Sequence, residues 1–278
     1  MSLAVCVLSY NHPEITAKCV KSVLRFYPAE AVYLTHNGSS EKNKNELEKN
    51  FPEIHHISIE QNRGYSGGAN FALHHIFQKY DWCFFITNDC ELTQVGSTPK
   101  KAALIAPQIH FRKIGRIDSV GGQFFANRGH LRHLKSVEEF RSIPQGQCYI
   151  PGTAFLMHKD IFENTMGFDE SFHTYWEDVD LSLRAHKLGH ELNYDTHFQV
   201  IHSVGKTCHK EPYYTTYLFH RNRARVSRKC TPWSDNFGLT RSQLEFNLLV
   251  DFCLYSSRFI RQKKWDRAQN LLRAYYGD

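Results

Sequence analysis

The stretch GFDESFHTYWEDVDLSLRAHKLGHEL carries the acids best suited to acid–base chemistry. Its apolar spacing predicts a helix over 178–188, which places Glu177 and Asp178 at the first turn, where the helix dipole favours carboxylates. A general base needs a carboxylate within hydrogen-bond reach of the attacking hydroxyl, so this pair is a candidate base, while one of the two could instead cap the helix. Aromatic rings beside carboxylates are typical of sugar sites, so Tyr175 and Trp176 are predicted to face a sugar.

Asp89 lies in FFITNDCEL, directly after an apolar run that predicts a buried strand. A carboxylate in this place suits Mg²⁺ or Mn²⁺, hard cations that take oxygen ligands and bridge phosphates. The alternative is an aspartate that caps the following turn. His202 ends a second β-like run, VIH, and is a candidate ligand for the same metal, although a single histidine is more often a structural hydrogen-bonding group.

The stretch QNRGYSGGAN places three glycines within five positions, between a strand over 54–59 and a helix over 69–80. Glycine lets a backbone approach another group closely, so the stretch is either a ligand loop or a flexible turn that also starts a helix. The glycines run G-x-x-G-G, and this order excludes the G-x-G-x-x-G dinucleotide fingerprint.

The elements that must position these residues alternate in the first third of the chain. Apolar runs predict strands, helical spacing predicts helices, and this alternation predicts a parallel sheet with helices on both faces. Ligands bind beyond the carboxyl ends of strands in such sheets, and the polar tips SYNHP, THNGS, NRGYSGG and TNDCE all fall there. The predicted strands are 3–10, 31–35, 54–59 and 82–87, and the predicted helices are 13–26, 42–50 and 69–80.

The rest of the chain follows a different pattern. Residues 104–157 predict shorter mixed strands, ELNYD and FQVIHS predict two edge strands, and 212–273 predict helices broken near 230–236. We expect one α/β domain whose second half wraps onto the first.

Composition narrows the class of partner. The chain has 278 residues, is 41% hydrophobic and 22% charged, and is typical of a globular protein. Its net charge of +6 suits anionic partners, but no nucleic-acid motif accompanies the basic residues, so we expect no nucleic-acid partner. Eight cysteines without a C-x-x-C pair are expected to be reduced and mostly buried, which favours a cytoplasmic location. No signal peptide and no bilayer-spanning run is expected.

Seven segments together resemble, in order, the large family 2 type of inverting GT-A-fold glycosyltransferases, most closely the bacterial rhamnosyltransferase-type branch. The resemblance covers residues 3–229. The matching segments are VCVLSYNHPE, HNGSS, NRGYSGGAN, TNDCEL, PGTAFLMHKDIFENTMGFDESFHTYWEDVDLSLRAHKLG, IHSVGKT and YLFHRNRAR. It implies a Rossmann-like, mostly parallel central sheet flanked by helices, with a catalytic domain at 1–229 and a helical C-terminal extension at 230–278. The nucleotide-binding half would be about 1–95 and the acceptor half about 96–229.

The resemblance also implies an activity: transfer of a hexosyl or deoxyhexosyl group from a nucleotide-sugar donor to an acceptor hydroxyl, with inversion, in bacterial polysaccharide or glycan biosynthesis. Asp178 matches the general base, with Glu177 beside it, and Asp89 matches the last acid of a D-x-D-type motif for Mg²⁺ or Mn²⁺, with His202 as a further ligand. The implied nucleotide-binding residues are Ser9, Tyr10, Asn11, His36, Asn62, Arg63, Gly64, Gly67, Asn70 and Asn88. The implied sugar-binding residues are Gly152, Thr153, Tyr175 and Trp176.

Two positions depart from the family pattern. His36 stands where an acidic residue usually precedes NGS, which leaves the nucleotide base open, and Thr87 replaces the first acid of the metal motif. A nucleotide-sugar- or carbohydrate-binding protein of the same fold without turnover is therefore the alternative. A sugar-phosphate nucleotidyltransferase is disfavoured, because SYNHPE replaces the glycine-rich basic loop of that class.

The implied acceptor is a glycan or a lipid-linked glycan. Apolar and basic residues mix over 241–273, so this region either packs on the catalytic domain or rests on anionic lipid at the inner face of the cytoplasmic membrane.

Overall fold

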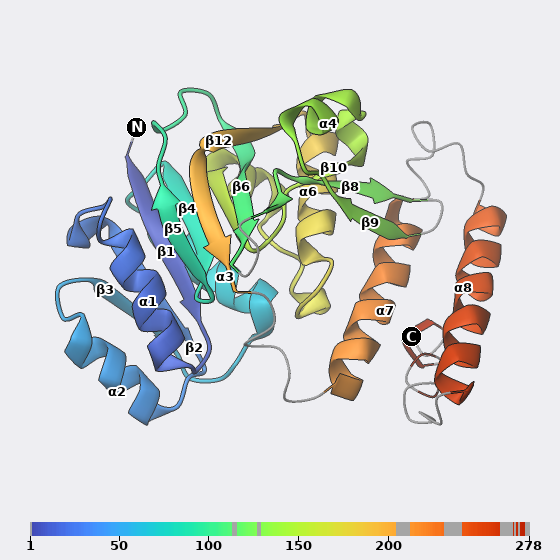
Figure 1. Cartoon of the computed structure of the whole chain (residues 1–278), viewed down its shortest axis with the longest axis horizontal. Coiled ribbons are helices and arrows are strands. Elements are labelled where there is room, and N and C mark those ends of the chain that lie inside the picture. The colour runs from blue at the N-terminus through green and yellow to red at the C-terminus, as the bar shows by residue number, and fades with distance from the viewer. Residues whose placement is uncertain are drawn as a thin grey trace.

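Figure 1 shows the computed structural model of the chain, which describes residues 2–112, 116–126, 129–203, 212–230, 241–261, 269, 271 and 273–275. Within them, a nine-stranded sheet runs in the order β3-β2-β1-β4-β11-β6-β12-β5, with β7 paired to β6, and a three-stranded sheet runs β10-β8-β9. The first four strands are β1 (Leu3–Ser9), β2 (Val32–Asn37), β3 (His55–Ile59) and β4 (Trp82–Thr87). The others are β5 (Cys90–Gln94), β6 (Ala103–Phe111), β7 (Ile117–Ser119), β8 (Gly122–Phe125), β9 (His130–His133), β10 (Cys148–Tyr149), β11 (Ala154–His158) and β12 (Glu191–His202).

The first four strands pair in parallel, as the sequence predicts. β1 is buried on both faces because its residues alternate between two cores. Ala4 and Cys6 belong to the core that includes helix α3 (Gly64–Ile76), whereas Val5 and Val7 belong to the core that includes α1 (Pro13–Val23). The sheet is thus covered on both sides, and the carboxyl ends of its parallel strands lie along one edge.

The second half of the sheet is mixed. β11 lies antiparallel between β4 and β6, and β12 runs parallel to β6 and antiparallel to β5. The two predicted edge strands are wrong, because ELNYD and FQVIH form one strand, β12, with partners on both sides. A register shift between Asp195 and Gln199 interrupts its pairing with β6, which explains why the sequence pattern breaks there.

The helices are α1 (Pro13–Val23), α2 (Glu41–Asn50), α3 (Gly64–Ile76), α4 (Val137–Ser142), α5 (Lys159–Thr165), α6 (Glu177–Lys187), α7 (Pro212–Cys230) and α8 (Arg241–Arg261). Short 3₁₀ turns are η1 (Ala29–Ala31), η2 (Gln145–Gln147) and η3 (Glu170–Phe172). α3 begins at Gly64 rather than at the predicted residue 69, so Gly67 and Gly68 belong to its first turns. The predicted helix over 178–188 agrees with α6 within one residue at each end.

α7 and α8 lie at the end of the molecule opposite α1 and α2 (Figure 1). Ala224 of α7 packs with Leu244 and Leu248 of α8 and with Leu271, Ala274 and Tyr275. Leu254 of α8 is exposed, as is Arg261. Lys263 and Lys264, on which the membrane-contact prediction rests, lie outside the described residues. In the parts of the chain that the structure describes, no helix has the length and apolar character needed to span a membrane.

Most of the cysteines that the structure describes are buried, as expected. Cys6, Cys19, Cys83, Cys90 and Cys148 are free and buried, and Cys253 is free and exposed.

Candidate active site

The loops after β1 and β2 are joined through Asn11. Its backbone N–H donates to Ser39 Oγ at 2.9 Å, and its Oδ1 accepts from the Ser40 N–H at 3.0 Å. Asn11 has a φ of 55°, a left-handed conformation that asparagine tolerates better than most residues. These bonds bring two of the predicted polar tips together at the carboxyl edge of the sheet.

Asn37 joins the loop after β2 to the glycine stretch. Its Oδ1 accepts from the Arg63 N–H at 3.1 Å, and its Nδ2 donates to the Gly64 carbonyl at 2.8 Å. A Cβ on Gly68 would lie 2.6 Å from Asn37 Nδ2, and one on Gly64, at φ 70°, would lie 2.4 Å from the His173 carbonyl oxygen. Gly64 and Gly68 therefore allow close packing within the protein, and the nucleotide contact of this stretch stays a prediction.

The polar side chains of this stretch also bond within the protein. Asn62 Oδ1 accepts from the Gly64 N–H at 2.8 Å, and Arg63 pairs with the Glu170 carboxylate at 3.0 Å. Asn70 Nδ2 donates to the Phe168 carbonyl at 2.8 Å, and its Oδ1 accepts from the Phe168 N–H at 2.8 Å. The stretch thus ties the edge of the sheet to the segment that carries the candidate base.

Two predicted nucleotide-binding residues lie inside the protein. Ser9 Oγ and Asn88 Nδ2 both lie 2.9 Å from Thr16 Oγ1, and Ser9 and Asn88 are buried. Their side chains therefore hold the β1 and β4 ends together. Tyr10, in contrast, is 43% exposed, and its ring is open to a ligand.

His36 forms a stacked pair with His56. His36 Nε2 lies 3.0 Å from His56 Nδ1, and His56 Nε2 lies 2.9 Å from the Phe51 carbonyl oxygen, which can only accept. The neutral tautomers that satisfy both bonds have each Nε2 donating, which leaves His36 Nδ1 as an acceptor without a partner among the described residues. Burial lowers the pKa of His36 to about 4, so the ring is neutral near pH 7. With Glu48, these two histidines also form a group with metal-ligand spacing.

Asp89, Cys90 and His202 bring potential ligand atoms within 4.8 Å of one another. Asp89 Oδ2 lies 3.4 Å from His202 Nε2, and its Oδ1 accepts from Thr87 Oγ1 at 2.8 Å. Carboxylate oxygen and imidazole nitrogen fit Mn²⁺ well and Mg²⁺ less well, while the thiol is the softest of the three donors. The group joins the predicted Asp89 and His202, and it adds Cys90, which the sequence did not single out.

Asp118 is a second carboxylate beside His202, 3.9 Å from Nδ1, and it also lies 3.1 Å from His133 Nδ1. Burial alone would lower the pKa of His202, but the Asp118 and Asp89 carboxylates outweigh it and raise that pKa to about 9. At 3.9 Å Asp118 makes no hydrogen bond to His202, whose Nδ1 has no hydrogen-bond partner among the described residues, so the role of Asp118 toward His202 is electrostatic. Nothing in the local sequence IDSVG indicates this role, because it depends on the pairing of β7 with β6.

Asp178 is held at the start of α6 by backbone donors. Its Oδ2 accepts from the Gly152 N–H at 2.9 Å, and its Oδ1 accepts from the Val179 N–H at 2.8 Å. Tyr65 donates to the Gly152 carbonyl at 2.5 Å, so Gly152 is held from both sides. Burial raises the pKa of Asp178, and the two N–H groups oppose that rise by favouring the carboxylate.

Glu177 differs from its neighbour. It is 5% exposed, and its Oε2 has no hydrogen-bond partner among the described residues. Burial, with the nearby Asp178 charge, raises the pKa of Glu177 well above its usual range. The pair is therefore asymmetric: Asp178 is the better stabilised carboxylate, and Glu177 favours the protonated form.

Tyr175 and Trp176, the aromatic residues predicted to face a sugar, differ in how deeply they are buried. Trp176 is 3% exposed and packs against Phe124 and Phe219, which places its ring in a core. The ring is enclosed by other apolar side chains, which does not favour the predicted sugar contact of Trp176. Tyr175 is half-buried against the same core.

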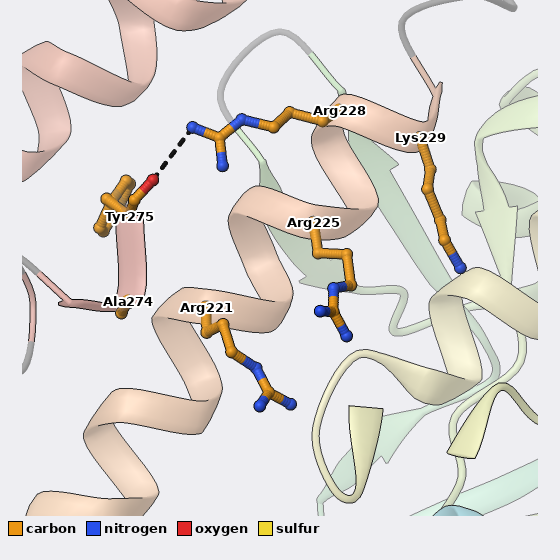
Figure 2. A pocket seen from close by; sticks show the side chains of 6 residues that line it. All are labelled: Arg221, Arg225, Arg228, Lys229, Ala274 and Tyr275. Carbon is orange, nitrogen blue, oxygen red and sulfur yellow. Dashed lines mark hydrogen bonds between the residues drawn. The ribbon is translucent and has the colours of Figure 1, made fainter. Parts of the chain in front are cut away.

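The basic face of α7 lines a pocket of about 310 Å³, together with Ala274 and Tyr275. Figure 2 shows that Arg228 points toward Tyr275, whereas Arg221, Arg225 and Lys229 point away from it. Arg228 pairs with Glu245, and Lys229 pairs with Asp169 and Asp180. Most of this charge is thus engaged within the protein.

Gly152 and Thr153 connect the two candidate centres. The Thr153 carbonyl accepts from the Thr87 N–H at 3.0 Å, and the Thr87 hydroxyl donates its one hydrogen to Asp89 Oδ1 at 2.8 Å. The adjacent Gly152 bonds Asp178. One chain of hydrogen bonds therefore runs from the possible metal ligands to the candidate base.

Solved structures with the same fold include those of GalNAc-T7, PcManGT and TarS. GalNAc-T7, crystallised with UDP, GalNAc and Mn²⁺, has a TM-score of 0.62 and 13% identity over 82% of this chain and 48% of that chain. The mannosyltransferase PcManGT from Pyrobaculum calidifontis, in complex with GDP-Man and Mn²⁺, has a TM-score of 0.57 and 10% identity. The match covers 99% of this chain and 85% of that chain. S. aureus TarS 1-349, in complex with UDP, has a TM-score of 0.52 and 15% identity. The match covers 89% of this chain and 70% of that chain. The present chain spans about half the length of the GalNAc-T7 chain.

A comparison with curated protein sequences gives no match. The GT-A fold predicted from the sequence is confirmed by the mixed α/β architecture and by these neighbours. Residues 4–166, more than half of the chain, match the family model described as glycosyl transferase family 2, and the chain belongs to that family.

Proposed function

We propose that this protein transfers a sugar from a nucleotide-sugar donor to an acceptor hydroxyl with inversion at the anomeric carbon. The observation that carries the proposal is the hydrogen-bonded connection from Asp89 through Thr87, Thr153 and Gly152 to Asp178. This connection supports the proposal because it links the Asp89 and Asp178 carboxylates at the carboxyl edge of the sheet. Membership of glycosyl transferase family 2 supports the same class of reaction.

Asp178 is the proposed general base. As the acceptor oxygen attacks the anomeric carbon, Asp178 takes the hydroxyl proton and the bond to the nucleotide diphosphate breaks. The Gly152 and Val179 N–H groups hold the carboxylate in one orientation through the reaction. Glu177, which favours the protonated form, leaves the negative charge on Asp178.

Asp89 and His202 are the proposed ligands of Mg²⁺ or Mn²⁺, with Cys90 adjacent. Such an ion, when bound, neutralises charge on a leaving diphosphate. Thr87 orients Asp89 through its hydrogen bond, and the Asp118 carboxylate adds negative charge beside His202. GalNAc-T7 and PcManGT were each crystallised with Mn²⁺, which supports the proposal.

The domain bounds, the acceptor, the pathway and the location proposed here rest on the sequence resemblance to family 2 glycosyltransferases. We propose a catalytic domain at 1–229 with a C-terminal extension at 230–278, a glycan or lipid-linked glycan acceptor, and a role in bacterial polysaccharide biosynthesis in the cytoplasm or at the inner face of its membrane. The rhamnosyltransferase-type branch remains the most similar one by sequence pattern. UDP and GDP-Man in the neighbours leave the donor nucleotide open.

A binding protein of the same fold is the second candidate. Asp89 is the single carboxylate of the motif TND, and the buried His36 stands where an acidic residue usually precedes NGS. Both features would suit a protein that retains nucleotide binding without turnover.

The test is a thermal-shift panel of nucleotide diphosphates and their sugars, with and without Mn²⁺, followed by a transfer and hydrolysis assay with each stabilising donor. We expect metal-dependent stabilisation and release of nucleotide diphosphate. Stabilisation without any release, in the presence of glycan acceptors, would favour the binding protein.

A further inference from the structure

The backbone just before the candidate base has an unfavourable conformation. His173, Tyr175 and Trp176 have φ values of 63°, 69° and 73°. Left-handed φ is disfavoured for residues with a large side chain, and such residues persist only where the surrounding structure holds them. Because α6 begins at Glu177, the conformation of these residues sets where Glu177 and Asp178 lie.

Asn222 of α7 donates hydrogen bonds to three backbone carbonyls of the segment 172–176, which leads into α6. Its Nδ2 lies 2.8 Å from the Phe172 carbonyl oxygen, 2.8 Å from that of Thr174 and 2.9 Å from that of Tyr175. An amide has two N–H donors, so three carbonyls share them. Asn222 is fully buried, which means that water cannot replace these bonds if the amide is removed.

The orientation of the amide is fixed as well. Asn222 Oδ1 accepts from Arg221 Nε at 2.9 Å, which directs the NH₂ group toward the three carbonyls. Arg221 also donates to the Ser171 carbonyl at 2.8 Å, and Arg225 donates to Ser171 Oγ at 2.9 Å. Figure 2 shows both arginines on the same side of α7.

The opposite side of the segment is held by α3. The Ser66 N–H donates to the His173 carbonyl at 3.1 Å, and Gly64 packs so closely on His173 that a Cβ would overlap it. The segment is thus bound between the first turn of α3, at the donor edge, and α7. Among the hydrogen bonds that α7 side chains donate to backbone carbonyls of this segment, those of Asn222 reach furthest toward the base, because Arg221 and Arg225 end at residues 171 and 172.

We infer that Asn222 is a positioning residue for the glycosyl transfer proposed above: it fixes the carbonyls of residues 172–175, and through them the placement of Asp178 against the acceptor. The inference rests on the proposed function. Asn222 does not touch substrate; it acts through the backbone that leads into α6. Aspartate has no donor to offer these carbonyls, and leucine has a similar volume without polar atoms.

The experiment compares Asn222→Leu and Asn222→Asp with the wild-type chain. We expect kcat to fall by about 10²-fold, since a misplacement of about 1 Å costs that much, while the Kd for the nucleotide diphosphate changes less than threefold. Asn164→Leu is the matched control, because Asn164 bonds only His190 among the described contacts, at the surface. This control should keep the wild-type kcat.

A second measurement separates positioning from general stability. Amide hydrogen exchange of residues 173–179 should quicken in the Asn222 variants, with the exchange of β1 and β4 unchanged. Asn222→Ser, which keeps one donor, should lie between the wild type and Asn222→Leu in both kcat and exchange. If the wild type itself transfers no sugar, the proposed function fails, and the exchange data still test the role of Asn222.

Two results would overturn the inference. One is an unchanged kcat with unchanged exchange at 173–179 in Asn222→Leu. The other is faster exchange throughout the chain with parallel loss of nucleotide binding in all three variants, which would make Asn222 a residue of general stability.

Discussion

The donor edge and the base segment of this protein are built in different ways. At the donor edge, the ends of β1, β2 and β4 are placed by parallel pairing, and Asn11 and Asn37 join neighbouring loops. The base segment, residues 169–176, has only the short turn η3 as regular structure, and side chains of α7 hold it from more than 40 residues away. Strand pairing therefore positions the donor edge, whereas side chains of α7 hold the segment that leads into the base. Changes near the base should accordingly reduce turnover and leave nucleotide binding intact.

The sharpest test of this contrast is Asp178→Asn. We expect transfer to fall by about 10²–10⁴-fold, because the amide cannot accept the acceptor proton, while nucleotide-diphosphate affinity stays within a few-fold. Initial rates and calorimetry on the same preparations measure both quantities. Glu177→Gln is the neighbouring comparison and should retain most of its activity. If Glu177→Gln is inactive and Asp178→Asn is active, the base is Glu177 and the two roles are exchanged.

The reverse pattern is expected at the donor edge. Asp89→Ala should weaken metal-dependent binding of nucleotide diphosphate by about 10- to 100-fold, since it removes a proposed ligand. Titration calorimetry with Mn²⁺ and then with a chelator measures the effect. Asp160→Ala, at a half-exposed carboxylate beside His158, is the control. Equal affinity in wild type and Asp89→Ala, insensitive to chelator, would show that binding at this edge does not use a metal at Asp89.

The smallest effect concerns stability. Burial raises the pKa of Glu177 well above its ordinary value of 4.5, so the folded state loses stability as the pH rises from about 4.5, where the unfolded chain ionises, until the folded pKa is passed. Glu177→Gln should therefore raise the free energy of unfolding by at least about 1 kcal/mol at pH 8. The gain should vanish below about pH 4.5, where Glu177 is neutral in the folded and in the unfolded state. Urea unfolding at several pH values measures it.

The control for that experiment is Glu46→Gln on the exposed face of α2, which should change the free energy of unfolding little. A gain for Glu177→Gln that is the same at every pH would show that ionisation of Glu177 is not its cause.

The sequence predicts the donor edge better than the base segment, for a physical reason. Apolar runs such as Leu3–Ser9 are long enough to be buried on both faces, so strands, parallel pairing and the placement of Asp89 follow from local pattern. The sequence also predicts the start of α6, because helical apolar spacing and acidic residues of a first turn occur together there.

What the sequence could not reveal depends on contacts between distant segments. Asn222, Asp118 and Tyr65 are ordinary polar residues until folding brings them to Tyr175, His202 and Gly152. The same applies to Trp176, whose neighbours Phe124 and Phe219 come from β8 and α7 and enclose a ring that sequence alone placed beside a sugar. The glycines of QNRGYSGGAN were expected to meet a ligand, yet their nearest neighbours are Asn37, Arg63 and His173.

The most direct test of the central claim is the stereochemistry of one transfer reaction. With the donor that stabilises the protein most, the configuration of the new glycosidic bond is followed by proton NMR for the wild type and for Asp178→Asn. We predict a product whose anomeric configuration is opposite to that of the donor, formed by the wild type and nearly absent with Asp178→Asn. A product that retains the donor configuration, or equal product from both proteins, would contradict an inverting displacement with Asp178 as the base.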